Sequence, residues 1–96
     1  MAPSLQAMLS RHALARMQQR GIGPGVIDSV LQYGREYHDR HGGVIVCLDK
    51  RGRRQMQRAS GMRDVEIDAL TGVYVVLTTD GTIITVGHRY RRMRHH

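Results

Sequence analysis

Apolar residues recur at helical spacing near the start of the chain, and they predict a helix over residues 11–20. Ser10 is a suitable N-cap for this helix, and Gly21 supplies the left-handed residue that commonly follows a helix C-terminus. The apolar positions lie four residues apart: Leu9 just before the helix, and Ala13 and Met17 within it. A second helix is predicted from Pro24 to the residue before Gly34. Its apolar face comprises Val26, Ile27, Val30 and Leu31.

Runs rich in β-branched residues predict two pairs of strands. A short edge strand over residues 35–39 precedes a strand over 44–48, whose nearly continuous apolar character is typical of a central strand. The clearest pair covers residues 73–78 and 82–88, joined by a turn at 79–81. Simple alternation on the last strand puts Ile84, Val86 and His88 on one side, and on the other Ile83, Thr85, Gly87 and Arg89.

The segment between the two pairs of strands is basic. Residues 49–59 predict a helix with Asp49 as its N-cap, although Gly52 weakens its first turn. One side of this helix carries Arg51, Arg54 and Arg58. Residues 60–71 contain apolar positions that suit a strand and others that suit a helix, and we expect a loop with one helical turn.

These elements predict an α+β fold, with an N-terminal helical hairpin packed on an antiparallel sheet of three to four strands, in the order α-α-β-β-α-β-β. At 96 residues we expect one domain over residues 1–96, with tails at 1–9 and 93–96. Cys47 is the only cysteine, and the sequence has neither a signal-peptide core nor an apolar run of membrane-spanning length. A cytoplasmic protein without disulfides and without a membrane partner is expected.

The charge of the chain points to a phosphate-bearing partner. The formal net charge is +7, and Lys50 is the only lysine among 15 basic residues. Because the planar guanidinium suits bidentate phosphate contacts, this bias favours nucleic acid, although a GC-rich genome or an acidic protein partner would also account for it. His38 and His41 have a His-x-x-His spacing with no further ligand nearby, so no metal and no other cofactor is expected.

The sharpest functional signal is a stripe on the first predicted helix. His12, Arg16 and Arg20 lie at i, i+4 and i+8, so three groups with affinity for anions share one side of it. This stripe lies beside the apolar face and therefore borders the core. In that position its side chains can line a cleft. The alternative is that His12 covers the edge of the core and the two arginines are solvated.

Two segments resemble a bacterial family of small domains of unknown function. They are His-Ala-Leu-Ala-Arg-Met-Gln-Gln-Arg-Gly-Ile from His12, and Asp-Gly-Thr-Ile-Ile-Thr-Val-Gly-His-Arg-Tyr-Arg-Arg from Asp80. That family is marked by a His-x-x-x-Arg helix and a final Gly-x-Ile-x-Thr-Val strand, and it is grouped with the barnase, EndoU, colicin and RelE-like fold of metal-independent ribonucleases and toxins. The resemblance implies a RelE-like fold. The site that it implies consists of His12, Arg16, Thr85, His88, Arg89 and Tyr90.

We therefore expect a small basic toxin domain that cleaves RNA by attack of the ribose 2′-hydroxyl on the adjacent phosphate. His12 and His88 would carry the two proton transfers, in either order, because histidine titrates near neutral pH. Arg16 and Arg89 would hold the scissile phosphate, with a hydrogen bond from Thr85. Tyr90 would stack on the base or hydrogen-bond to it. The flanking backbone would be bound by Arg20, Arg54, Arg58, Arg91 and Arg92.

The expected partners are RNA, including RNA on the ribosome, and an acidic antitoxin or immunity protein. The alternative function is a non-catalytic module that uses the same basic surface to bind nucleic acid or an acidic protein. The histidine pair distinguishes the two, because binding needs only arginines, whereas acid–base catalysis needs His12 and His88 to face one cleft. A structural or regulatory module carried with another protein is a third alternative.

Overall fold

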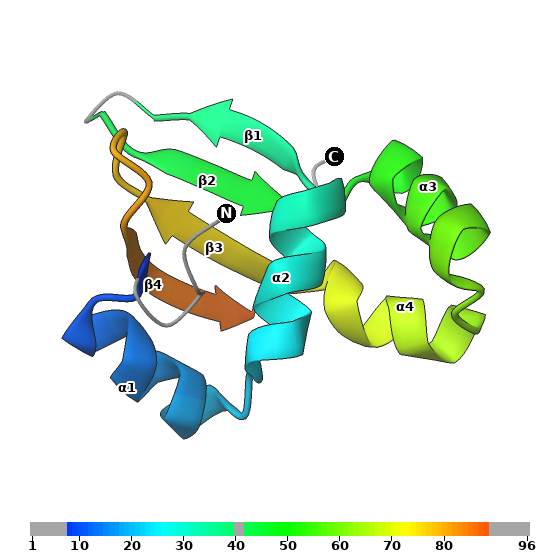
Figure 1. Ribbon diagram of the computed structural model, residues 1–96, viewed down its shortest axis with the longest axis horizontal. Helices are drawn as coiled ribbons and strands as arrows, with labels where there is room; N and C mark the ends of the chain where they lie inside the picture. Colours follow the sequence, from blue (N-terminus) through cyan, green and yellow to red (C-terminus); the bar gives the residue numbers. More distant parts are fainter. Residues whose placement is uncertain (1–7, 40–41, 89–96) are drawn as a thin grey trace, which may run out of the picture.

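The computed structural model describes residues 8–39 and 42–88 of the chain, in one sheet and a set of helices (Figure 1). Its elements are α1 (Arg11–Arg20), α2 (Pro24–Tyr33), β1 (Arg35–His38), β2 (Val44–Cys47), α3 (Lys50–Ser60), α4 (Asp64–Thr71), β3 (Val73–Leu77) and β4 (Ile83–His88). The strands form one antiparallel sheet in the order β1-β2-β3-β4. The predicted α+β class is confirmed, and β2 is central as expected.

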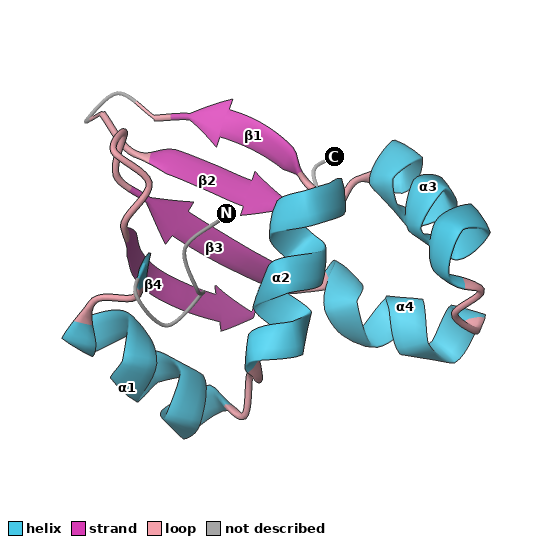
Figure 2. Ribbon diagram, in the orientation of Figure 1, coloured by secondary structure: helices cyan, strands magenta, loops and turns pink. Residues whose placement is uncertain are grey.

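The core lies between one face of the sheet and the first two helices. Ala13 and Met17 of α1, with Ile27 and Val30 of α2, pack on the strands there. Each fully buried aliphatic side chain contributes about 1.5–3 kcal/mol through the hydrophobic effect. Beyond one end of the sheet lie α3 and α4 (Figure 2). They share a second, smaller cluster of buried residues: Leu48, Met56, Ile67 and Leu70.

Ser10 caps α1 as the sequence predicts, and it also ties the helix to the sheet. Its hydroxyl oxygen accepts a hydrogen bond from the backbone N–H of Ala13 at 3.0 Å, and it donates to the carbonyl oxygen of Ile84 at 3.4 Å. The backbone N–H of Ser10 donates to the carbonyl oxygen of Ile83 at 2.9 Å. The start of α1 is therefore held beside the start of β4.

Replacing Ser10 by alanine is expected to lower the free energy of unfolding by about 0.5–2 kcal/mol, because the first turn of α1 loses its side-chain acceptor. Urea denaturation followed by circular dichroism measures this loss. Ser10→Asn keeps a capping oxygen and is expected to retain most of the stability. Equal losses in the two variants would show that the cap is not the cause.

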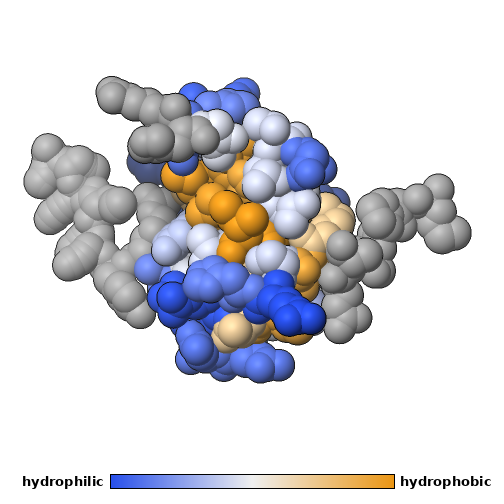
Figure 3. Space-filling view, turned by 90° about the vertical axis from the view of Figure 1, so that its left-hand side faces the viewer, coloured by the Kyte–Doolittle hydropathy of each residue, from blue (hydrophilic) through white to orange (hydrophobic). Residues whose placement is uncertain are grey.

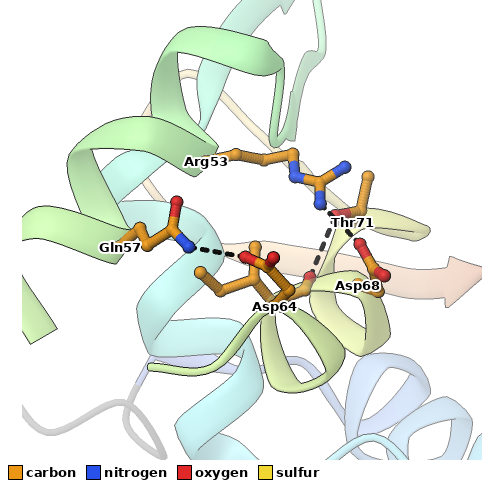
Figure 4. A network of polar contacts seen from close by, with 6 residues as sticks. Arg53, Gln57, Asp64, Asp68 and Thr71 are labelled. Atoms are coloured by element: carbon orange, nitrogen blue, oxygen red, sulfur yellow. Dashed lines mark hydrogen bonds and ion pairs between the residues drawn. The ribbon is translucent and has the colours of Figure 1, made fainter. Parts of the chain in front are cut away.

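The segment 60–71 differs from the predicted loop, because it contains the full helix α4. The carboxylate of Glu66 accepts a hydrogen bond from the backbone N–H of Arg63 at 2.9 Å, which stabilises the first turn. Ile67 and Leu70 are buried against α3, whereas Val65 is 65% exposed, so the strand-like alternation of the sequence did not indicate burial. Side chains of α3 and α4 also bond to one another (Figure 4), through Arg53 with Asp68 and Gln57 with Asp64.

The alternation predicted for the last strand is wrong at its start. Thr85 pairs with Val76, but Ile83 pairs with Leu77, so the register shifts by one residue at Ile84. This β-bulge turns Ile83 into the core, where it is fully buried, and leaves Ile84 37% exposed. Beyond the bulge the expected alternation holds as far as His88, and the predicted position of Arg89 lies outside the described residues.

Candidate functional site

Helix α1 lies along the free edge of β4 and runs in the same direction. Leu9 forms a parallel bridge with Ile83 at one end, although it falls in a predicted tail. At the other end, Nη1 of Arg20 donates to the carbonyl oxygen of Val86 at 3.0 Å. These contacts occupy backbone groups that an edge strand would otherwise expose to another chain. The stripe of His12, Arg16 and Arg20, which we call the α1 stripe, therefore follows β4.

Two members of the α1 stripe are joined directly. Nε of Arg16 donates a hydrogen bond to Nε2 of His12 at 3.2 Å, and Nη1 of Arg16 donates to Oε1 of Gln19 at 3.2 Å. Accepting this bond requires that Nε2 of His12 carry no proton. The guanidinium of Arg16 is thus positioned by two neutral acceptors that leave its charge uncompensated.

Acidic side chains do not neutralise the α1 stripe within the part of the chain that the structure describes. The ion pairs of those residues join Arg35 to Asp49, His38 to Glu36, Arg53 to Asp68, and Arg63 to Glu66. None of them includes a residue of α1, and α1 itself contains no aspartate or glutamate. Its positive charge remains available to an anion.

The guanidinium of Arg20 lies near Tyr74, a tyrosine that was not among the residues predicted from the sequence. Tyr74 of β3 pairs with Gly87 of β4. A Cβ atom on Gly87 would lie 2.5 Å from Nη1 of Arg20 and 2.7 Å from the hydroxyl oxygen of Tyr74. The missing side chain of Gly87 therefore lets the guanidinium and the phenol gather on the sheet face opposite the core. Thr85, two residues earlier, points to this same face.

His88 lies at the other end of α1 from His12. Its Nε2 is 3.2 Å from the carbonyl oxygen of Arg20, in the last turn of the helix. It pairs with Val73, so it belongs to the core-facing side of β4 rather than to the side of Thr85. His12 stands in the first turn, about 12 Å from Arg20 along the helix axis. The structure therefore does not bring the two histidines together in the one cleft that the sequence analysis expected.

The match with known families covers all the elements of this site. Residues 9–88 match the model of DUF4258, a domain of unknown function. The chain belongs to the DUF4258 family. The expected small-domain family of unknown function is thus confirmed, and both segments that pointed to it, on α1 and β4, overlap the matched range. Neither the curated proteins nor the solved structures contain a significant match to the chain.

The other predicted site residues of this DUF4258 domain are divided between a second surface and the ends of the chain. Arg54 and Arg58 belong to α3, on the opposite side of the molecule from α1 (Figure 1). Arg89, Tyr90, Arg91 and Arg92 lie outside the described residues, and so does His41 of the His-x-x-His spacing, which was not expected to bind a metal. Among residues 8–39 and 42–88, no three metal-binding side chains come together, and no helix has the length and apolar character of a membrane span.

One hollow of the DUF4258 domain does not suit the same kind of ligand. It has a volume of about 300 Å³ and an apolar lining that includes Leu31, Val44 and Leu77, with Glu36 and His38 at its polar part. From the side at which β2 begins, apolar residues are seen between hydrophilic ones (Figure 3). Because a carboxylate beside apolar side chains disfavours a polyanion, we do not assign this hollow to the nucleic-acid site.

Proposed function

We propose that this domain binds RNA through the α1 stripe and cleaves it as a metal-independent ribonuclease of the RelE-like toxin kind. The observation that supports the proposal is the bonded pair of His12 and Arg16, which combines a proton acceptor and a phosphate-binding cation in one unit. Thr85 points to the sheet face that Arg20 reaches, between the points where β4 is anchored to Ser10 and Arg20.

The spacing of the arginines suits a nucleic-acid backbone. Arg16 and Arg20 are separated by one helical turn, a rise of about 6 Å, which is comparable to the separation of neighbouring phosphates on an extended strand. A guanidinium has five N–H donors, and Arg16 uses one on His12 and one on Gln19. The remaining donors are able to form a charge-assisted contact with a phosphate.

In the proposed reaction, the substrate phosphate accepts a hydrogen bond from the Nε–H of Arg16 in place of His12. The lone pair on Nε2 of His12 then becomes free. That lone pair accepts the proton of the 2′-hydroxyl while the 2′-oxygen attacks phosphorus. The bond from phosphorus to the 5′-oxygen breaks, leaving a 2′,3′-cyclic phosphate. Water supplies the proton to the departing 5′-oxygen, because Tyr74 and His88 lie near Arg20, at the other end of α1 from His12. Arg16 stabilises the charge on the phosphorane, while Arg20 holds the neighbouring phosphate.

Binding without cleavage is the second candidate function, and one observation favours it. The separation of His12 from His88 removes the histidine pair that the sequence analysis required for acid–base catalysis. The same cationic stripe would then hold the backbone of RNA or DNA, or an acidic protein such as an antitoxin.

Incubation of the full chain with end-labelled RNA in EDTA tests the proposal. We expect fragments that end in a 2′,3′-cyclic phosphate, and we expect DNA of the same sequence to bind without being cut. Arg16→Gln is expected to weaken RNA binding about 10–100-fold, since it removes a charged hydrogen-bonding group worth about 1.5–3 kcal/mol.

Arg11→Gln is the matched control, because Arg11 is an exposed arginine of the same helix outside the α1 stripe. It removes the same charge and is expected to change binding less than about threefold. If the parent chain binds RNA and leaves it intact, with and without ribosomes, the ribonuclease proposal fails and the binding function stands.

A further inference from the structure

Helix α3 has two chemically different sides. On the side toward α4, Arg53 forms an ion pair with Asp68, and Gln57 bonds to Asp64 (Figure 4). The outer side carries Arg51, Arg54 and Arg58, all exposed. None of these three has a carboxylate partner among the residues that the structure describes. The outer side of α3 therefore presents a row of uncompensated guanidinium groups.

A shallow hollow that is open to solvent adjoins this row where α3 meets the end of α2. It has a volume of about 470 Å³ and is lined by Gln32, Tyr33, Gln55, Arg58 and Ala59. Tyr33 is half-buried and packs against the second core cluster, which limits its movement. Gly52 lies so close to the end of α2 that a Cβ atom on it would be 2.3 Å from the carbonyl oxygen of Tyr33. The packing of the two helices thus fixes the geometry of the hollow.

We propose that this hollow binds one base of a single-stranded RNA whose phosphates contact the outer side of α3. The tyrosine ring offers a stacking surface, worth about 1–3 kcal/mol per base. Gln32 and Gln55 bring amide groups that donate to and accept from a base edge, and Arg58 binds the adjoining phosphate. A base must leave its helix to enter such a hollow, so the ligand is single-stranded RNA.

This inference rests on RNA as the ligand of the proposed function, and it adds a second contact far from the first. Because α1 and α3 are on opposite sides of the molecule (Figure 1), only a strand of sufficient length reaches both surfaces. Joining the two contacts raises the affinity through a high effective concentration. The domain is therefore expected to prefer long single strands to short ones and to duplexes.

Fluorescence anisotropy of the full chain with labelled RNA of about 4 and about 20 nucleotides tests this preference. The RNA carries 2′-O-methyl groups throughout, so that no 2′-hydroxyl is present to attack the phosphate and cleavage does not interfere. Arg58→Gln is expected to weaken binding of the long strand about tenfold or more, because that strand contacts both surfaces. Binding of the short strand is expected to weaken less, because a short strand can bind at α1 without contacting α3.

Two controls separate a base site from general attraction of charge. Arg63→Gln removes an equal charge from an exposed residue next to α4 that is already paired with Glu66, and it is expected to change binding less than about threefold. Tyr33→Leu keeps an apolar side chain but removes the ring, and it is expected to weaken binding of the single strand about 5–100-fold while affecting duplex RNA little. Crosslinking of 4-thiouridine RNA to the unaltered chain supplies a second measurement, with attachment expected at Tyr33 or its neighbours.

The outcomes separate this inference from the proposed function. If the parent chain leaves RNA intact while Tyr33→Leu and Arg58→Gln still weaken RNA binding, that result would contradict the ribonuclease proposal and support the base site. Dependence on Arg16 alone, with no crosslink near Tyr33, would overturn the base site and leave RNA binding by α1. Suppose that Tyr33→Leu leaves RNA binding unchanged, while a polyglutamate peptide competes with RNA and its own binding depends on Arg58. The surface would then bind an acidic protein, and the inference would be wrong.

Discussion

His12→Ala is expected to slow RNA cleavage by about 10²–10⁴-fold, because it removes the group that takes the proton from the 2′-hydroxyl. RNA affinity should fall much less, since the cations that hold the phosphates remain in place. The side chain of His12 is exposed, and its one hydrogen bond between described residues is with Arg16 on the same helix. Its removal therefore costs little stability, and the loss of rate would reflect chemistry rather than unfolding.

Single-turnover cleavage in EDTA, with affinity measured in parallel, checks this result. His38→Ala is the matched control, because His38 is an exposed histidine of β1 at the far edge of the sheet from α1. It is expected to cleave RNA at the rate of the parent chain. His88→Ala is expected to act on stability more than on rate, since its ring contacts the backbone of Arg20. Losses of rate of equal size in His12→Ala and His88→Ala would contradict the assignment and return His88 to the reaction.

Local signals were sufficient to predict most of the fold. The first helix begins after Ser10 and ends before Gly21, because a capping hydroxyl and a glycine with φ of 65° act within one turn. β2 was recognisable because its residues are apolar on both faces and it lies between two strands. Asp49 caps α3 by accepting from the backbone N–H of Gly52 at 2.8 Å, and this too is visible in the sequence.

Features that depend on a distant partner could not be predicted. Helix α4 was missed because its burial comes from packing against α3, through Ile67 and Leu70, and not from a clear period in its own sequence. The bulge at Ile84 depends on the register between β3 and β4. The same register decides that Tyr74 lies opposite Gly87, so no local pattern identifies this tyrosine as part of the candidate site.

The expected pair of His12 and His88 failed for a related reason. Sequence spacing predicts which residues share a helix face, but it does not predict the direction in which the helix passes a strand. Because α1 runs parallel to β4, the first turn of the helix meets the start of the strand and the last turn meets its end. His12 and His88 are therefore placed at opposite ends, whereas an antiparallel helix would have brought them close.

Gly52→Ala is expected to lower the free energy of unfolding by about 2 kcal/mol, although alanine favours a helix over glycine by about 1 kcal/mol. The new Cβ would lie 2.3 Å from the carbonyl oxygen of Tyr33, a backbone atom that cannot rotate away, and 3.1 Å from Cδ2 of Leu48. To relieve this contact, α3 must move away from the end of α2. The cost of that movement exceeds the gain in helix propensity.

Chemical denaturation of the variant beside Gly25→Ala measures the effect. Gly25 is an exposed glycine in the first turn of α2, with nothing within 4 Å of a Cβ atom, so its replacement is expected to be neutral or stabilising by up to about 1 kcal/mol. A Gly52→Ala protein that is as stable as the parent would show that the two helices are not packed as closely as described. Since the same contact positions α3 against Tyr33, a variant that remains folded is also expected to bind long single-stranded RNA more weakly, whereas Gly25→Ala is expected to keep the parent affinity.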